Sequence, residues 1–124
     1  MADLPVTLDW HCFDRLTAAR AAFATTPCVY AQTDRDRSVI RVGKAGGGLG
    51  PRYRGGTGYT IDAAMHESGN LVFVAAVPAD LVEAVEATLI WENRDRLVYN
   101  NIGRKRQLVE AVAVLHRGDT PRFD

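Results

Sequence analysis

The sequence predicts an α/β (α+β) domain with a small central three-stranded, mainly antiparallel sheet flanked by helices. Two short apolar runs, residues 28–31 and 38–42, flank a polar hexamer, which is typical of a β-hairpin. Residues 71–77, LVFVAAV, are continuously apolar and predict a buried strand at the sheet centre. A chain of 124 residues that is 47% apolar is long enough for one core, so we expect a single domain over 1–124.

Two further helices are expected outside this centre. Asp9 can cap a helix over residues 9–24, and a C-terminal helix is expected over 104–117. Apolar residues at helical spacing support both of them: Trp10, Phe13, Leu16, Ala19 and Phe23 in the first, and Leu108, Val109, Val112 and Leu115 in the second. These helices could cover the sheet or pair with another subunit, so the oligomeric state stays open.

The main helix is predicted over residues 81–94. Its apolar stripe comprises Leu81, Val82, Val85 and Leu89, and Glu86 lies at the edge of this stripe on a helical wheel. A carboxylate held half-buried by apolar neighbours needs a cation or a metal ion to offset its desolvation. Glu86 is therefore expected to have such a partner, either a cation or a metal ion.

Charge is neutral overall and uneven along the chain. Residues 30–60 hold six basic and two acidic residues, whereas residues 61–100 hold two basic and seven acidic ones. One side of the domain could therefore attract phosphate although the whole molecule does not. Cys12 and Cys28 lack a CxxC spacing and are expected to be reduced, and neither a signal peptide nor a membrane-length run is apparent. We expect a cytoplasmic protein that does not enter a membrane.

The glycine-rich run at residues 46–50 does not form a nucleotide-binding Walker A loop. That loop needs Lys followed by Ser or Thr after its last glycine, whereas here Lys44 precedes the glycines and Ala45 follows it. Glycines permit close approach of a ligand to the backbone, and two arginines, Arg52 and Arg54, follow at once. Guanidinium groups bind phosphate bidentately, so this segment is suited to hold an anionic oxygen group. The glycines could serve as a hinge or as a passage in which a strand of nucleic acid lies close to the backbone.

Four motifs in order resemble the GIY-YIG nuclease domain. Cys28-Val29-Tyr30 and Arg41-Val42-Gly43 stand where that family has its two tripeptides, and Arg41 follows Tyr30 at the expected offset of eleven positions. Lys44 follows the second tripeptide, Arg52 stands where the family has its catalytic arginine, and residues 85–90 resemble the helix with its metal-binding glutamate. Tyr99-Asn100 resembles the closing asparagine motif. The resemblance covers residues 27–103, and it departs from the family where Arg41 replaces the second tyrosine.

The resemblance implies a metal-dependent endonuclease that hydrolyses phosphodiester bonds with one divalent cation, Mg²⁺ or Mn²⁺. Glu86 would bind the metal, Arg52 would stabilise the transition state, and Tyr30 would orient or deprotonate the attacking water. His66 would assist proton transfer, and Asn100 would order the site by hydrogen bonding. Nucleic acid, with DNA as the expected form, would be contacted by Arg41, Lys44, Arg54 and Tyr59.

Arg41 also supports a second hypothesis. A guanidinium is always protonated and cannot accept a proton, so Arg41 cannot act as the base that the second tyrosine is often assigned to be. The alternative is a catalytically impaired module of the same kind that binds nucleic acid or another protein. A third reading is an enzyme whose pocket has adapted to a small phosphate ester or nucleotide.

Overall fold

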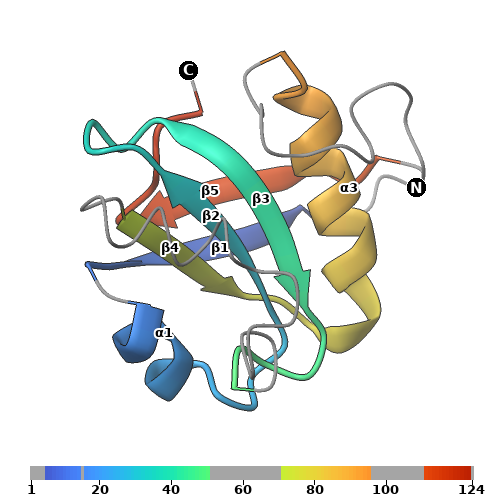
Figure 1. Cartoon of the computed structure of the whole chain (residues 1–124). Helices are drawn as coiled ribbons and strands as arrows, with labels where there is room; N and C mark the ends of the chain where they lie inside the picture. The colour runs from blue at the N-terminus through green and yellow to red at the C-terminus, as the bar shows by residue number, and fades with distance from the viewer. Residues whose placement is uncertain (1–4, 15, 51–70, 96–110, 124) are drawn as a thin grey trace.

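A computed structural model describes residues 5–14, 16–50, 71–95 and 111–123, and these residues form a mixed five-stranded sheet with helices packed against it (Figure 1). The α+β class is confirmed, whereas the prediction of three strands is wrong, since the strand order is β3-β2-β4-β1-β5. The strands are β1 (Val6–Phe13), β2 (Cys28–Thr33), β3 (Val39–Ala45), β4 (Leu71–Ala76) and β5 (Val114–Gly118). The helices are α1 (Leu16–Ala22) and α3 (Val82–Glu92), the latter preceded by the 3₁₀ turn η2 (Ala79–Leu81).

The predicted hairpin is confirmed as β2 and β3, which pair antiparallel. The turn between them is organised by Asp34, whose carboxylate accepts hydrogen bonds from the amides of Asp36 and Ser38 at 2.9 and 3.0 Å. Short side chains such as Asp favour this local bonding, which is why the polar hexamer turns the chain. Gln32 lies opposite Arg41 in the regular register, and the register shifts by one residue after it, so Thr33 lies opposite Val39.

The continuous apolar run predicted as a central strand is β4, which lies in the middle of the sheet. It pairs antiparallel with β2 on one side and with β1 on the other. Four of its six residues are buried, because both faces of a central strand are covered here by other elements. The predicted main helix is confirmed as α3, which follows directly through η2.

The N-terminal helix predicted over residues 9–24 is wrong for its first half. Residues Val6–Phe13 form β1, and only Leu16–Ala22 are helical. The buried residues Leu8 and Trp10 alternate with the exposed residues Thr7, Asp9 and His11, which is the period of a strand. The same aromatic residues also fit a spacing of three and four, so the sequence pattern alone did not separate the two periods.

The C-terminal helix predicted over residues 104–117 is also wrong where the structure describes it. Val114–Gly118 form β5, which pairs parallel to β1, and residues 104–110 lie outside the described residues. Leu115, predicted on the apolar face of a helix, has 54% of its surface exposed. A parallel partner far away in the sequence decides this conformation, and local residue spacing carries no signal for it.

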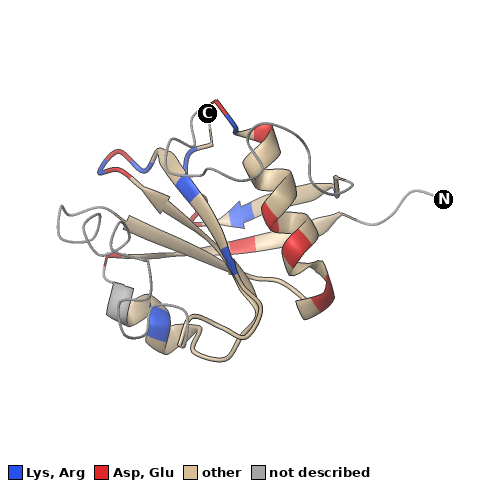
Figure 2. Ribbon diagram, turned by 45° about the vertical axis from the view of Figure 1, so that its right-hand side comes forward, with Lys and Arg blue, Asp and Glu red and all other residues tan. Residues whose placement is uncertain are grey.

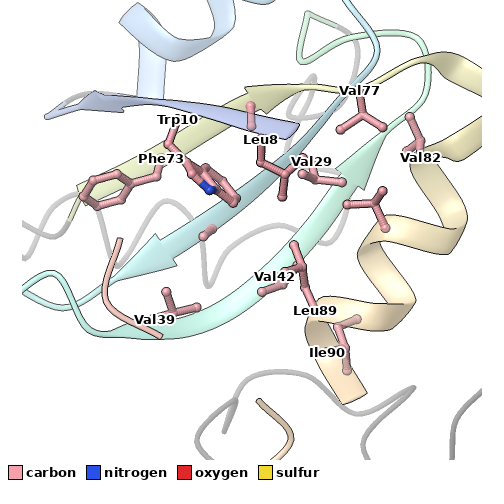
Figure 3. Close-up of a cluster of buried hydrophobic side chains, with 13 residues drawn as sticks. Leu8, Trp10, Val29, Val39, Val42, Phe73, Val77, Val82, Leu89 and Ile90 are labelled. Carbon is pink, nitrogen blue, oxygen red and sulfur yellow. The ribbon is translucent and has the colours of Figure 1, made fainter. Parts of the chain in front are cut away.

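The sheet has two covered faces, which we call the α3 face and the α1 face. On the α3 face, side chains from β1, β2, β3 and β4 pack with Val85, Leu89 and Ile90 of α3 (Figure 3). On the α1 face, Ala19 of α1 packs with Cys28, Tyr30, Ala45, Leu49, Val72 and Val74. Successive residues of a strand point to opposite faces, so the side chains of β2 and β3 alternate between the face covered by α3 and the face covered by α1.

The C-terminal segment links the first and last strands of the sheet. Arg122 forms a parallel bridge with Ser38, its carbonyl accepts from the Val39 amide at 2.9 Å, and its own amide donates to Arg37 O at 2.8 Å. Phe123 packs against Trp10, with ring centroids 5.9 Å apart. The chain end that follows β5 therefore reaches the start of β3, and this partly closes the curled sheet around the α3-face core (Figure 1).

Among the described residues, none of the helices is long and apolar enough to cross a lipid bilayer.

Candidate functional site

Two predicted site residues from distant segments meet on the α3 face. The Lys44 ammonium lies 4.0 Å from a carboxylate oxygen of Glu86, and the two side chains are 39% and 19% exposed. Lys44 is on β3 and pairs across the sheet with Val29, whose side chain belongs to the α3-face core. Lys44 of the basic hairpin segment thus meets the acidic helix α3, and Figure 2 shows β3 with its blue residues beside α3 with its red residues.

Helix geometry sets the environment of Glu86. Val82, Val85, Leu89 and Ile90 are all buried against the sheet, and Glu86 projects from the margin of this stripe. Glu83, one turn earlier, is exposed. The prediction that Glu86 lies partly buried at the edge of the apolar stripe is therefore confirmed, and of the two expected partners, a cation or a metal ion, the structure shows the cation of Lys44. A carboxylate with 19% exposure loses part of its hydration, which the Lys44 charge offsets.

A second polar group lies on the α1 face and contains the aromatic residue of the first motif. Arg41 donates from Nη1 to the Tyr30 hydroxyl at 3.1 Å and to Gln32 Oε1 at 3.4 Å, and its guanidinium lies 5.7 Å from the Tyr30 ring centroid. Tyr30 and Gln32 are fully buried. The Tyr30 ring lies directly over Gly43, where any Cβ atom would overlap its Cζ and Oη atoms.

The structure does not bring Tyr30 and Glu86 to one site. Tyr30 pairs with Gly43 and Val74 and packs in the α1-face core, whereas Lys44 and Glu86 meet on the α3 face. Lys44 lies opposite Val29, and Tyr30 lies opposite Gly43 in the next cross-strand pair. Side chains of neighbouring pairs point to opposite faces of a sheet, so the Tyr30 and Lys44 side chains lie on opposite faces. Tyr30 and Glu86, to which the resemblance gives roles in one reaction, therefore lie on opposite faces of the sheet.

The remaining predicted site residues lie outside the described residues. They are Arg52, Arg54, Tyr59, His66 and Asn100. Their predicted roles stay predictions.

At this site, Glu86 is the one carboxylate among the described residues that could bind a divalent cation. Among residues 5–14, 16–50, 71–95 and 111–123, no group of three or more His, Cys, Asp or Glu side chains is arranged to hold a metal. Mg²⁺ usually keeps several waters and binds through one or two carboxylates together with substrate phosphates. A half-buried Glu86 at the protein surface fits that limited role.

The two cysteines show no sign of thiolate chemistry. Burial raises the pKa of Cys28 to about 12, so its thiol stays protonated at neutral pH. Burial also raises the pKa of Cys12, against an opposing hydrogen bond from Arg37. Both thiols are free, as predicted.

Gln32 is the polar residue that the sequence reasoning missed. Its side chain is fully buried opposite Arg41, and its amide nitrogen has no hydrogen-bond partner. The available signal was a glutamine at the end of an apolar strand, two residues after Tyr30 and therefore on the same face.

The chain matches no protein-family model, no curated protein and no solved structure.

Proposed function

We propose that this protein hydrolyses phosphodiester bonds in nucleic acid as a metal-dependent endonuclease of the GIY-YIG type, with its site at Lys44 and Glu86. The observation that supports this most is the 4.0 Å approach of these two side chains. They belong to separate motifs, 42 positions apart in the sequence, and the resemblance gave each a role at one site. The antiparallel arrangement of β3, β2 and β4, followed by α3, is what brings them together.

In this proposal each described residue has a simple task. Glu86 would hold Mg²⁺ or Mn²⁺, which when bound neutralises charge on the phosphate and the leaving oxygen. Lys44, 39% exposed at the end of the edge strand β3, would contact a phosphate oxygen. Tyr30 has no part in this site and stabilises the hairpin through its packing over Gly43. Arg52, His66 and Asn100 keep the roles that the resemblance implies.

A supercoiled-plasmid nicking assay with Mg²⁺ and Mn²⁺ tests the proposal. We expect metal-dependent nicking by the native protein and a loss on the order of 10²-fold in Glu86→Ala, because a lost metal ligand removes transition-state charge stabilisation. Glu83→Ala is the matched control, since the same residue type lies exposed on the same helix one turn earlier. The absence of metal-dependent nicking, or equal rates in the two variants, would refute the assignment.

The second candidate is a non-catalytic module that binds nucleic acid or another protein. One observation favours it: the tyrosine of the first motif is buried, accepts a hydrogen bond from Arg41, and lies on the face opposite Glu86. A gel shift at increasing salt distinguishes this candidate when nicking is absent. Binding to phosphates weakens steeply as salt rises because counterions are released on association.

A further inference from the structure

Lys44 and Glu86 interact with each other in this structure, although the proposed function gives each of them a different ligand. The Lys44 ammonium lies 4.0 Å from Glu86 Oε1, and this ion pair is one of the interactions of the carboxylate. The Glu86 side chain is 19% exposed, so it has lost part of its hydration, and a nearby positive charge stabilises its ionised form. A cation is thus already held beside the carboxylate to which the proposed function assigns a metal ion.

The ammonium and a divalent cation compete for this carboxylate. Two positive charges a few ångströms apart repel each other, and the repulsion is larger when one of the ions is divalent. Lys44 must therefore move away from Glu86 when a metal ion binds there. It is free to do so, because its ammonium is carried on a flexible four-carbon chain that is 39% exposed on the edge strand β3.

A phosphate group and the carboxylate compete in turn for the ammonium. Lysine binds phosphate as a point charge, so a phosphate oxygen near Lys44 takes the place that Glu86 has in the ion pair. Each ligand therefore releases the residue that the other one needs: phosphate releases Glu86, and a metal ion releases Lys44. By thermodynamic linkage, the two ligands must raise each other's affinity by the same factor.

We propose that the Lys44–Glu86 ion pair couples the binding of a divalent cation to the binding of a phosphodiester. Without nucleic acid, the ammonium lowers the affinity of Glu86 for the metal ion. A phosphodiester bound at Lys44 removes this competition, so the site binds metal more tightly when the substrate is present. The inference rests on the ligands that the proposed function assigns to this pair, and it adds the regulation of that site.

Mn²⁺ binding to the full chain in the absence of DNA tests the first half of the coupling. Electron paramagnetic resonance of free Mn²⁺ gives the dissociation constant, and Lys44→Met should bind Mn²⁺ about fivefold or more tightly than the native protein, within the usual range of coupling between sites. Arg117→Met is the matched control, because it removes one positive charge from an exposed ion pair with Asp9 on β1 and β5. Equal affinities in the two variants, or no Mn²⁺ binding by the native protein and Lys44→Met, would overturn the coupling.

DNA binding in EDTA tests the second half and needs no substitution at Lys44. Fluorescence anisotropy of a short labelled duplex gives the affinity without metal. Glu86→Gln should bind DNA about fivefold or more tightly than the native protein, because the amide no longer pairs with the ammonium. Glu83→Gln is the matched control, since it removes the same charge from an exposed position one turn earlier on α3. Equal affinities in Glu86→Gln and Glu83→Gln would also overturn the coupling.

The nicking assay separates this inference from the proposed function. If nicking depends on Glu86 but Lys44→Met binds Mn²⁺ no more tightly than Arg117→Met, the coupling fails and the nuclease assignment stands. If both binding experiments give the expected differences and no variant or native protein nicks DNA, the coupling stands and the nuclease assignment fails.

Discussion

Gly43 shows how one residue decides what its neighbour can do. The Tyr30 ring occupies the space where a side chain at position 43 would begin, so the glycine of the second motif is needed for packing. The same contact holds the phenol over the strand, where Arg41 donates to it. A tyrosine packed in this way is a structural residue of the α1 face, whatever role its motif suggests.

Gly43→Ala should therefore destabilise the protein by about 1–3 kcal/mol, the usual cost of overpacking. Urea denaturation measures the free energy of unfolding. Gly46→Ala is the matched control, because a Cβ at that position meets no atom within 4 Å. Equal stability of the two variants would contradict the close contact between Tyr30 and Gly43.

His116 couples the stability of the fold to pH. Its Nδ1 accepts a hydrogen bond from Trp10 Nε1 at 2.9 Å, and the indole can only donate. The imidazole must therefore be unprotonated at Nδ1, and burial lowers the pKa of His116 below its usual value. The unfolded chain consequently binds a proton more readily than the folded chain, so the stabilisation is full above the unfolded pKa and declines as the pH falls.

The free energy of unfolding should fall by about 0.5–1 kcal/mol between pH 7.5 and pH 5.5 through this residue, the value of one partly exposed hydrogen bond. Urea denaturation at several pH values measures it. His116→Asn keeps an acceptor that does not titrate, so the variant should show a smaller loss over the same range. An identical pH dependence in both proteins would exclude the contribution of His116.

At the scale of elements, α3 holds the site by burying one stripe against the sheet. Leu89 is fully buried among residues of the α3 face, and Glu86 stands three positions earlier, at the margin of the same stripe. The position of the carboxylate thus depends on apolar packing that involves no charge. Figure 3 shows Leu89 and Ile90 of α3 directed at Val42 of β3.

Leu89→Ala should cost about 2–5 kcal/mol, because a fully buried leucine leaves a cavity that the core closes only in part. Leu115→Ala is the matched control, since the same residue type is 54% exposed on the edge strand β5 and should change stability by less than about 0.5 kcal/mol. Chemical denaturation of both variants gives the comparison. A small effect at Leu89 would contradict the packing of α3 on the sheet.

At the scale of the whole molecule, the C-terminal segment joins the two ends of the sheet. Its contribution comes from backbone hydrogen bonds with residues 37 and 39 and from the Phe123 ring against Trp10 and His116. Removing residues 121–124 should destabilise the protein by about 2–4 kcal/mol, from two hydrogen bonds and one partly buried aromatic ring. Hydrogen exchange at the Val39 amide should accelerate in the same variant.

Arg122→Ala distinguishes backbone from side-chain contributions in that segment. The Arg122 side chain is exposed, and one of its contacts, the hydrogen bond to Asp36 O, is long, at 3.4 Å. This variant keeps both backbone bonds and should leave stability and the protection of Val39 nearly unchanged. If the truncation has no larger effect than Arg122→Ala, the C-terminal segment does not close the sheet.

The amino-acid sequence by itself determined the hairpin, the central strand, the main helix and the half-buried Glu86. Each of these rests on local spacing: two apolar runs around a turn, a continuous apolar run, and a stripe with one carboxylate at its edge. Such patterns report burial directly, because the period of the apolar residues is the period of the element that buries them.

Only the tertiary structure decided that residues 6–13 and 114–118 are strands, since each finds its partner in a distant segment and its residue spacing also fits a helix. The tertiary structure also decided which motif residues share a face. The strand register places Lys44 on the same face as Glu86 and Tyr30 on the same face as Arg41. A one-residue change of register would move each side chain to the other face. Register is a property of two paired strands, so it cannot be predicted from the residues of one segment alone.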